Sequence, residues 1–172
     1  LGSDDYQLSA VPNLSLKYKD KFFASVQEGV GYNVIKGDGW RIGPVAKYAF
    51  GRDEDGDSNF RIGGDKTNAL RGLGDVDGTI ELGGFAEYTW QKWGAKLELR
   101  QGIDGHEGWV GDIGANYTTT MESFLSSQGR PNILSVGPRA TFVGRNFNEA
   151  YFGVNAAQSA RSGLPRYNAD GG

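Results

Sequence analysis

Apolar and polar residues alternate with a period of two along most of this chain, and helical periodicity is nearly absent. Such alternation is typical of strands with one apolar and one polar face. Between residues 76 and 90, for example, Ile80 and Leu82 alternate with Thr79 and Glu81. Turn signals separate eight such segments, which we predict to be strands over residues 8–18, 22–34, 40–50, 76–90, 93–100, 109–121, 134–142 and 150–156. The pattern therefore predicts an all-β, antiparallel, up-and-down fold.

Alternation alone leaves two architectures open. The apolar face points into a shared core in a soluble sandwich, but out to lipid in an outer-membrane β-barrel. Strand length favours the barrel, because most segments reach the roughly ten residues that a tilted membrane crossing needs. Glu28 interrupts the apolar face of segment 22–34 and is an exception to the pattern.

The polar faces carry charges in mid-strand. In a barrel these side chains would line the lumen, where charges of opposite sign could neutralise one another across neighbouring strands. A carboxylate pair such as Glu81 with Glu98, or Glu87 with Glu98, would resemble a hydrolase site, but interleaved lysine and arginine favour structural ion pairs. The predicted lumen charges are Arg41, Lys47, Glu81, Glu87, Lys96, Glu98, Arg100, Asp112 and Arg139.

Aromatic residues cluster at the ends of the predicted strands, as in the two aromatic girdles of membrane barrels. If chain direction reverses at every turn, one girdle contains Tyr32, Trp40, Trp90 and Trp93, and the other contains Tyr18, Phe22, Phe50 and Trp109.

Composition narrows the function classes. The 172 residues suit one domain, and the absence of cysteine excludes disulfides, thiolate metal sites and cysteine nucleophiles. The net charge is −3 and the basic residues are scattered, which argues against nucleic acid as a partner. The lone histidine, His106, lacks the partners of a catalytic or metal site, so we predict a turn or loop contact for it. We predict no cofactor.

An acidic segment lies within residues 51–74, where Asp53, Glu54, Asp55 and Asp57 follow one another closely. The spacing begins like a calcium loop but fails at Ser58, where the loop needs glycine, and a solvated acidic loop is favoured. We therefore predict no catalytic residue and no metal site.

Several segments together resemble the MipA/OmpV family of MltA-interacting outer-membrane proteins, and their order and spacing extend over essentially the whole chain. They are LGSDDY at 1–6, GVGY at 29–32, GRDE at 51–54, GLGDVD at 72–77, ELGGFAEY at 81–88, GHEG at 105–108, YFGV at 151–154 and SGLP at 162–165. The resemblance implies a twelve-stranded barrel in the outer membrane of a Gram-negative bacterium. Residues 1–172 would then form part of one barrel domain, about eight strands, without the removed signal peptide, the first strand and roughly three last strands.

The resemblance also implies a function. Similar proteins are described as non-enzymatic scaffolds that bring a murein-degrading lytic transglycosylase together with a penicillin-binding protein at the outer-membrane lipid. The alternative is a small channel for solutes or antibiotics, and a lipid-facing hydrolase ranks last because no serine–histidine constellation exists. With one strand before Leu1 and a periplasmic N-terminus, the acidic segment would face the periplasm and could dock a cell-wall enzyme. An extra strand within residues 60–64 would reverse that orientation.

Overall fold

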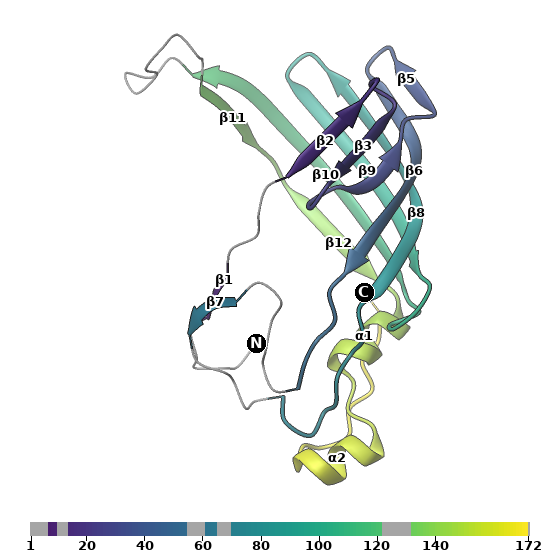
Figure 1. Ribbon diagram of the computed structural model, residues 1–172, viewed down its shortest axis with the longest axis vertical. Coiled ribbons are helices and arrows are strands. Elements are labelled where there is room, and N and C mark those ends of the chain that lie inside the picture. Colours follow the sequence, from purple (N-terminus) through teal and green to yellow (C-terminus); the bar gives the residue numbers. More distant parts are fainter. Residues whose placement is uncertain (1–6, 10–13, 55–60, 65–69, 122–131, 172) are drawn as a thin grey trace.

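The protein is built on one large antiparallel sheet. The computed structural model describes residues 7–9, 14–54, 61–64, 70–121 and 132–171 (Figure 1). Ten strands form the sheet, in the order β11-β10-β9-β8-β6-β4-β3-β2, with β12 also paired to β10 and β5 to β6. The sheet curls around an interior space, but its edge strands β2 and β11 are not paired with each other in the described chain. The antiparallel all-β prediction is confirmed, whereas the described sheet is not closed into a barrel.

The elements follow the chain in a simple order. They are β1 (Gln7–Ser9), β2 (Ser15–Tyr18), β3 (Phe22–Ser25), β4 (Gly29–Tyr32), β5 (Ile35–Gly37), β6 (Trp40–Ala49), β7 (Arg61–Gly64), β8 (Thr79–Trp90), β9 (Trp93–Gly102), β10 (Trp109–Met121), β11 (Asn132–Val136), β12 (Arg139–Val143), α1 (Arg145–Phe152) and α2 (Ala156–Ser162). The four longest strands, β6, β8, β9 and β10, match predicted segments closely. The extra strand considered within residues 60–64 is present as β7, but it pairs with β1 outside the large sheet and so adds no strand to that sheet.

Three predicted strands are each divided in two. Segment 8–18 contains β1, which lies outside the large sheet, and β2 at the edge of that sheet. Segment 22–34 folds into the β3–β4 hairpin, whose turn is fixed by the Glu28 N–H donating to Ser25 Oγ at 2.8 Å and by Gly29 at φ 78°. The Glu28 exception in the pattern thus marks a turn. Segment 134–142 divides at residues 137–138, because Pro138 has no N–H to donate to a ladder; its carbonyl instead accepts from Ala115 at 3.1 Å.

The predicted strand 150–156 is wrong, since helices α1 and α2 cover most of it. Asn155 caps α2 through a reciprocal capping box with Gln158, and Gly163 ends the helix in the left-handed region at φ 74°. Over a span as short as residues 150–156, alternating apolar residues are compatible with either a strand or a helix. The cap residues of α2 were therefore the better indication of a helix.

Burial alternates along the long strands, and the concave face is the buried one. On β8, Thr79, Glu81 and Phe85 are buried, whereas Ile80 and Leu82 are about half exposed. The apolar core of the concave face is a small cluster of Phe23, Val45 and Phe85, in which the two phenyl rings meet edge to face at 5.4 Å. The convex face therefore carries most of the leucines, isoleucines and valines of the long strands, and the concave face carries most of the charges.

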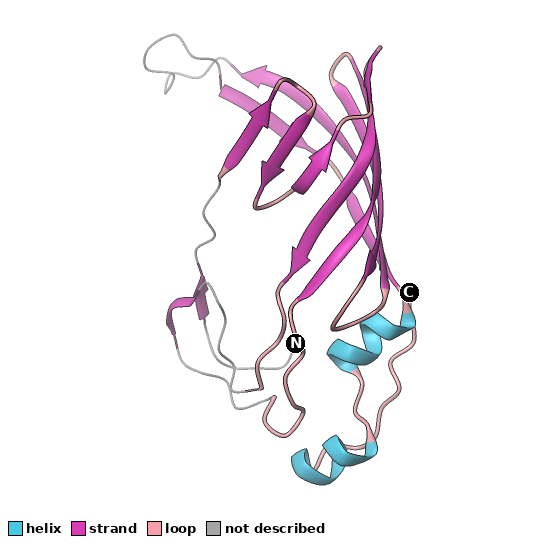
Figure 2. Ribbon diagram, turned by 45° about the vertical axis from the view of Figure 1, so that its right-hand side comes forward, coloured by secondary structure: helices cyan, strands magenta, loops and turns pink. Residues whose placement is uncertain are grey.

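A cap of loops and helices covers one end of the curved sheet (Figure 2). The cap consists of α1, α2 and residues 50–54, 70–78 and 102–108. It lies at the end of the long strands opposite the β8–β9 turn. Among the described residues, no helix is long and apolar enough to cross a membrane.

Candidate functional site

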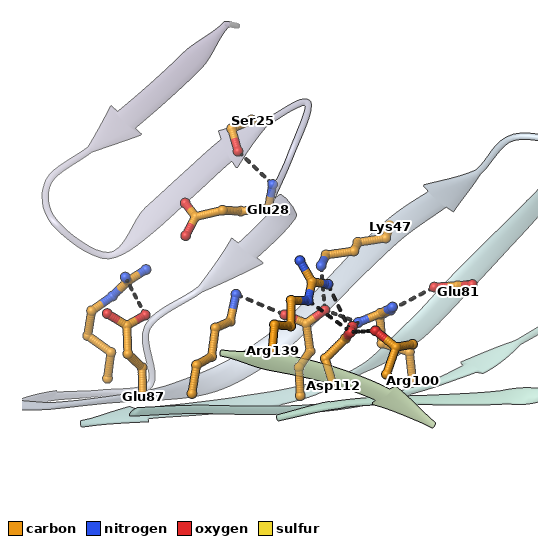
Figure 3. Close-up of polar contacts among 12 residues, drawn as sticks. Ser25, Glu28, Lys47, Glu81, Glu87, Arg100, Asp112 and Arg139 are labelled. Carbon is orange, nitrogen blue, oxygen red and sulfur yellow. Dashed lines mark hydrogen bonds and ion pairs between the residues drawn. The ribbon is translucent and has the colours of Figure 1, made fainter. Parts of the chain in front are cut away.

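The charged side chains of the concave face converge on one arginine. Arg100 is 6% exposed, and its Nε donates to Glu81 Oε2 at 2.6 Å. Its Nη1 donates to Asp112 Oδ2 at 2.9 Å and also contacts Glu98. One guanidinium from β9 thereby joins carboxylates on three neighbouring strands, β8, β9 and β10 (Figure 3).

Each of these carboxylates has a second cationic or polar partner. Glu98, whose side chain is fully buried, forms ion pairs with Lys47 at 2.5 Å and with Lys96 at 3.0 Å. Asp112 accepts from Arg139 at 2.8 Å and from the Thr141 hydroxyl at 2.6 Å. Strand register explains the convergence, because Asp112 pairs with Glu98 across β10 and β9, and Lys47 pairs with Glu81 across β6 and β8.

We call this set of ion-paired side chains the Arg100 network, and its charges are arranged to stabilise the fold. Four cations, Lys47, Lys96, Arg100 and Arg139, face three carboxylates, Glu81, Glu98 and Asp112, so the network has a surplus of one positive charge. Buried carboxylates are tolerable only when they are paired and hydrogen-bonded. Because Arg100 bridges Glu81 and Glu98, neither is arranged as the free acid and base of a hydrolase pair.

The two remaining predicted lumen charges form a separate pair. Arg41 Nη1 donates to Glu87 Oε2 at 3.0 Å, and both side chains are about one quarter exposed. The Arg41 guanidinium also lies over the rings of Phe23 and Phe85 at 5.2 and 5.6 Å. It therefore links the charged part of the concave face to the apolar cluster.

His106 extends the Arg100 network into the cap. Its ring is fully buried, with Nε2 3.1 Å from Glu81 Oε1. Nδ1 accepts from the Gly108 N–H at 3.0 Å, so Nε2 carries the proton and donates to Glu81. The ring also packs edge-on against Phe147 of α1, 4.8 Å away. Sequence reasoning placed His106 in a loop contact but missed its burial and its link to the charged strands.

The described part of the acidic segment is tied into the cap. Glu54 Oε2 accepts from the N–H groups of Gly72 at 3.1 Å and Gly74 at 2.9 Å. The Glu54 N–H in turn donates to Asp75 Oδ1 at 2.8 Å. Glu54 therefore shapes the loop, and Asp53 lies exposed beside it. Asp55 and Asp57 lie outside the described residues, and in the described part no cluster of histidine and acidic side chains could hold a metal ion.

Residues about one hundred positions apart hold the cap against the end of β6. Arg52 Nη1 donates to the Tyr151 carbonyl, and the Tyr151 hydroxyl donates to the Phe50 carbonyl at 3.1 Å. Burial raises the pKa of the Tyr151 phenol, and the carboxylate of Glu81 adds to the effect. Burial also lowers the pKa of Arg52, whose Nε and Nη2 have no hydrogen-bond partner.

Aromatic residues lie at both ends of the long strands. Trp40 stacks near Tyr88 at 4.7 Å and Trp93 near Tyr117 at 5.0 Å, at the end where Trp90 pairs with Trp93. Phe50 and Trp109 lie at the capped end. Tyr18 and Phe22 differ from the expected alternation, because Phe22 pairs with both Tyr18 and Tyr32. The extra reversal in the β3–β4 hairpin places these three rings at one level.

The fold and this site define a mostly-β protein with an apolar outer face and an ion-paired inner face. The chain belongs to the MipA family, whose model, described as MltA-interacting protein MipA, matches residues 1–172. Comparisons with curated proteins and with solved structures gave no match.

Proposed function

We propose that this chain forms the wall of an outer-membrane β-barrel and acts as a non-enzymatic scaffold for peptidoglycan remodelling. Its partners would be an MltA-type lytic transglycosylase and a penicillin-binding protein. The single observation that carries the proposal is membership of the MltA-interacting family across the whole sequence. Localisation in the outer membrane of a Gram-negative bacterium follows from the same membership.

The distribution of apolar side chains supports the membrane part of the proposal. Leu97, Leu99 and Ile113, in the middle of adjacent strands, are each more than half exposed on the convex face. Contiguous apolar surface of this kind is unfavourable in water but is the normal outer surface of a membrane barrel. The ion-paired concave face would then line the barrel interior, where Lys47, Glu98 and Arg100 have one another as partners.

The cap is the candidate docking region for the partner enzymes. Because the β3–β4 hairpin adds a reversal, β2 begins and β6 ends at the same end of the sheet, so the strand count behind the predicted periplasmic orientation no longer holds and the crosslinking test below decides the side. It is the part of the described chain with the most extensive non-strand structure, and the acidic segment begins within it. We assign the docking charge to the acidic segment of Asp53, Glu54, Asp55 and Asp57, in which Glu54 also holds the loop through Gly72 and Gly74. A partner with a basic surface would suit this segment.

Affinity capture of the full-length, membrane-extracted protein followed by mass spectrometry tests the scaffold. We expect a lytic transglycosylase or a penicillin-binding protein to be recovered. The variant D53N/D55N/D57N should lose most of this recovery, and Asp38→Asn, in a turn at the uncapped end, is the matched control. Capture of neither enzyme, with measurable conductance in planar bilayers, would instead favour the channel alternative.

The side of the membrane is tested separately by crosslinking from positions 55 and 57 in intact cells. Capture of periplasmic proteins supports the docking role. Labelling by surface reagents alone would contradict it and would place the segment outside the cell.

A further inference from the structure

A cavity of about 220 Å³ lies on the concave face, beside the Arg100 network. Three cations of that network, Lys47, Lys96 and Arg139, contribute to its lining, together with the carboxylates Glu98 and Asp112 to which they are paired. The turn between β3 and β4 contributes Gln27 and Glu28. The cavity thus has walls from two parts of the sheet that are distant in sequence.

The cations at this cavity keep unused hydrogen-bonding capacity. Arg139 directs Nε and Nη2 to Asp112 Oδ1, yet its side chain is 66% exposed and its Nη1 has no partner among the described residues. Lys96 contacts Glu98 at 3.0 Å and remains about one third exposed. Since an ammonium has three donors and a guanidinium five, both groups can donate to a further anionic oxygen. The surplus positive charge of the network favours such an anion.

The opposite charge at this cavity comes from Glu28. Its backbone N–H is fixed by Ser25 Oγ at 2.8 Å, which holds the turn. In Figure 3 the Glu28 side chain lies above the strands of the concave face with its carboxylate directed toward the Glu87 side, and Glu28 lines the same cavity as Lys47 and Arg139. The side chain is half-buried, and within the described part of the chain it forms no ion pair. Glu28 is thus an available carboxylate in the lining that also contains Lys96 and Arg139.

We propose that this cavity binds a small zwitterion of the α-amino-acid class. The carboxylate of the solute would lie against Arg139 and Lys96, and its ammonium group against Glu28. The cavity has room for a handful of water molecules, which limits the solute to a few heavy atoms. An anion alone would leave Glu28 unpaired, and a cation alone would meet the surplus positive charge. This inference stands independently of the scaffold function.

A matched series of three solutes tests the proposal on the folded full-length protein in detergent micelles, by ligand-observed NMR titration. L-Alanine carries both charges, propionate retains only the carboxylate, and ethylammonium retains only the cation. We expect alanine to bind at least about tenfold more tightly than either single-charge analogue, because only alanine forms charge-assisted hydrogen bonds with both walls of the cavity.

Two variants assign the charges of the solute to the two walls. Glu28→Gln should reduce alanine affinity about tenfold, to that of propionate, and leave propionate unchanged or tighter. Arg139→Gln should weaken both carboxylates and leave ethylammonium unaffected. Glu149→Gln, an exposed glutamate of α1, is the matched control and should change nothing.

Either of two results would overturn the proposal: alanine binding no tighter than propionate, or unchanged alanine affinity in a folded Glu28→Gln protein. If that variant does not fold, Glu28→Asp keeps the charge on a shorter side chain and should still weaken alanine selectively. Enzyme capture by Glu28→Gln, measured in parallel, should equal that of the wild type. The solute site and the scaffold can therefore fail separately.

Discussion

The two faces of strands β8, β9 and β10 are built on opposite principles. On the concave face Glu98, Arg100 and Asp112 are buried and linked by hydrogen bonds, whereas on the convex face Leu97 and Leu99 are 57% and 58% exposed. These residues alternate along the same strand or its neighbour. The difference shows that period-two alternation specifies two faces, and that the solvent around the molecule decides which face is interior.

The largest effect is expected at the centre of the concave face. Arg100→Met leaves Glu81, Glu98 and Asp112 buried around an uncharged side chain, which should cost about 3–5 kcal/mol of unfolding free energy. Urea unfolding in detergent micelles, followed by tryptophan fluorescence, measures this loss. Arg145→Met removes an exposed arginine of α1 and should cost at most about 1 kcal/mol. Equal losses in the two variants would contradict the structural role of the network.

On the convex face, the introduction of a charged side chain should be the destabilising change. Leu99→Arg places a cation in the middle of the proposed lipid-facing surface, and we expect a loss of about 2–4 kcal/mol in lipid vesicles. Leu99→Met is the matched apolar control. If the Leu99→Arg variant is as stable in lipid vesicles as the wild type, the convex face does not contact lipid. The inferred contrast between a lipid-facing and an interior face would then be wrong.

A smaller, local effect is expected in the cap. Glu54→Ala removes the acceptor for the N–H groups of Gly72 and Gly74, with a cost of about 1–3 kcal/mol for opening the loop. Hydrogen exchange should accelerate at residues 72–74 and stay unchanged in β9. Acceleration throughout the sheet would show that the cap and the sheet are one cooperative unit.

The smallest effect concerns the Tyr151 hydroxyl. Because its pKa is raised in the folded protein, its contribution is complete below the ordinary tyrosine pKa of about 10 and declines as the pH rises above that value. Tyr151→Phe should cost about 0.5–1 kcal/mol at neutral pH and nothing further in alkali. Tyrosinate absorbance should lose its highest-pKa component in this variant. An unchanged titration would place that phenol in water.

The comparison also shows why some features were predictable. The long strands and the charged face follow from local alternation, and the short turn at residues 91–92 fixes the register of β8 and β9, which places Glu87 beside Lys96. The β3–β4 hairpin was missed because Glu28 looked like an exception rather than a turn. The contacts of Glu54 with Gly72 and of His106 with Glu81 could not be predicted, because they depend on how loops fold over the sheet end.

The ties between Arg52, Phe50 and Tyr151 have a consequence for the order of assembly. The sheet joins mostly strands that are neighbours in sequence, so it can grow by one hairpin after another. The cap instead closes a loop of about one hundred residues, from Phe50 to Tyr151. Such distant contacts form slowly. We therefore expect a folding intermediate in which β8, β9 and β10 are already protected while the segment around Tyr151 is still open to proteases, so the cap would report on the completion of folding.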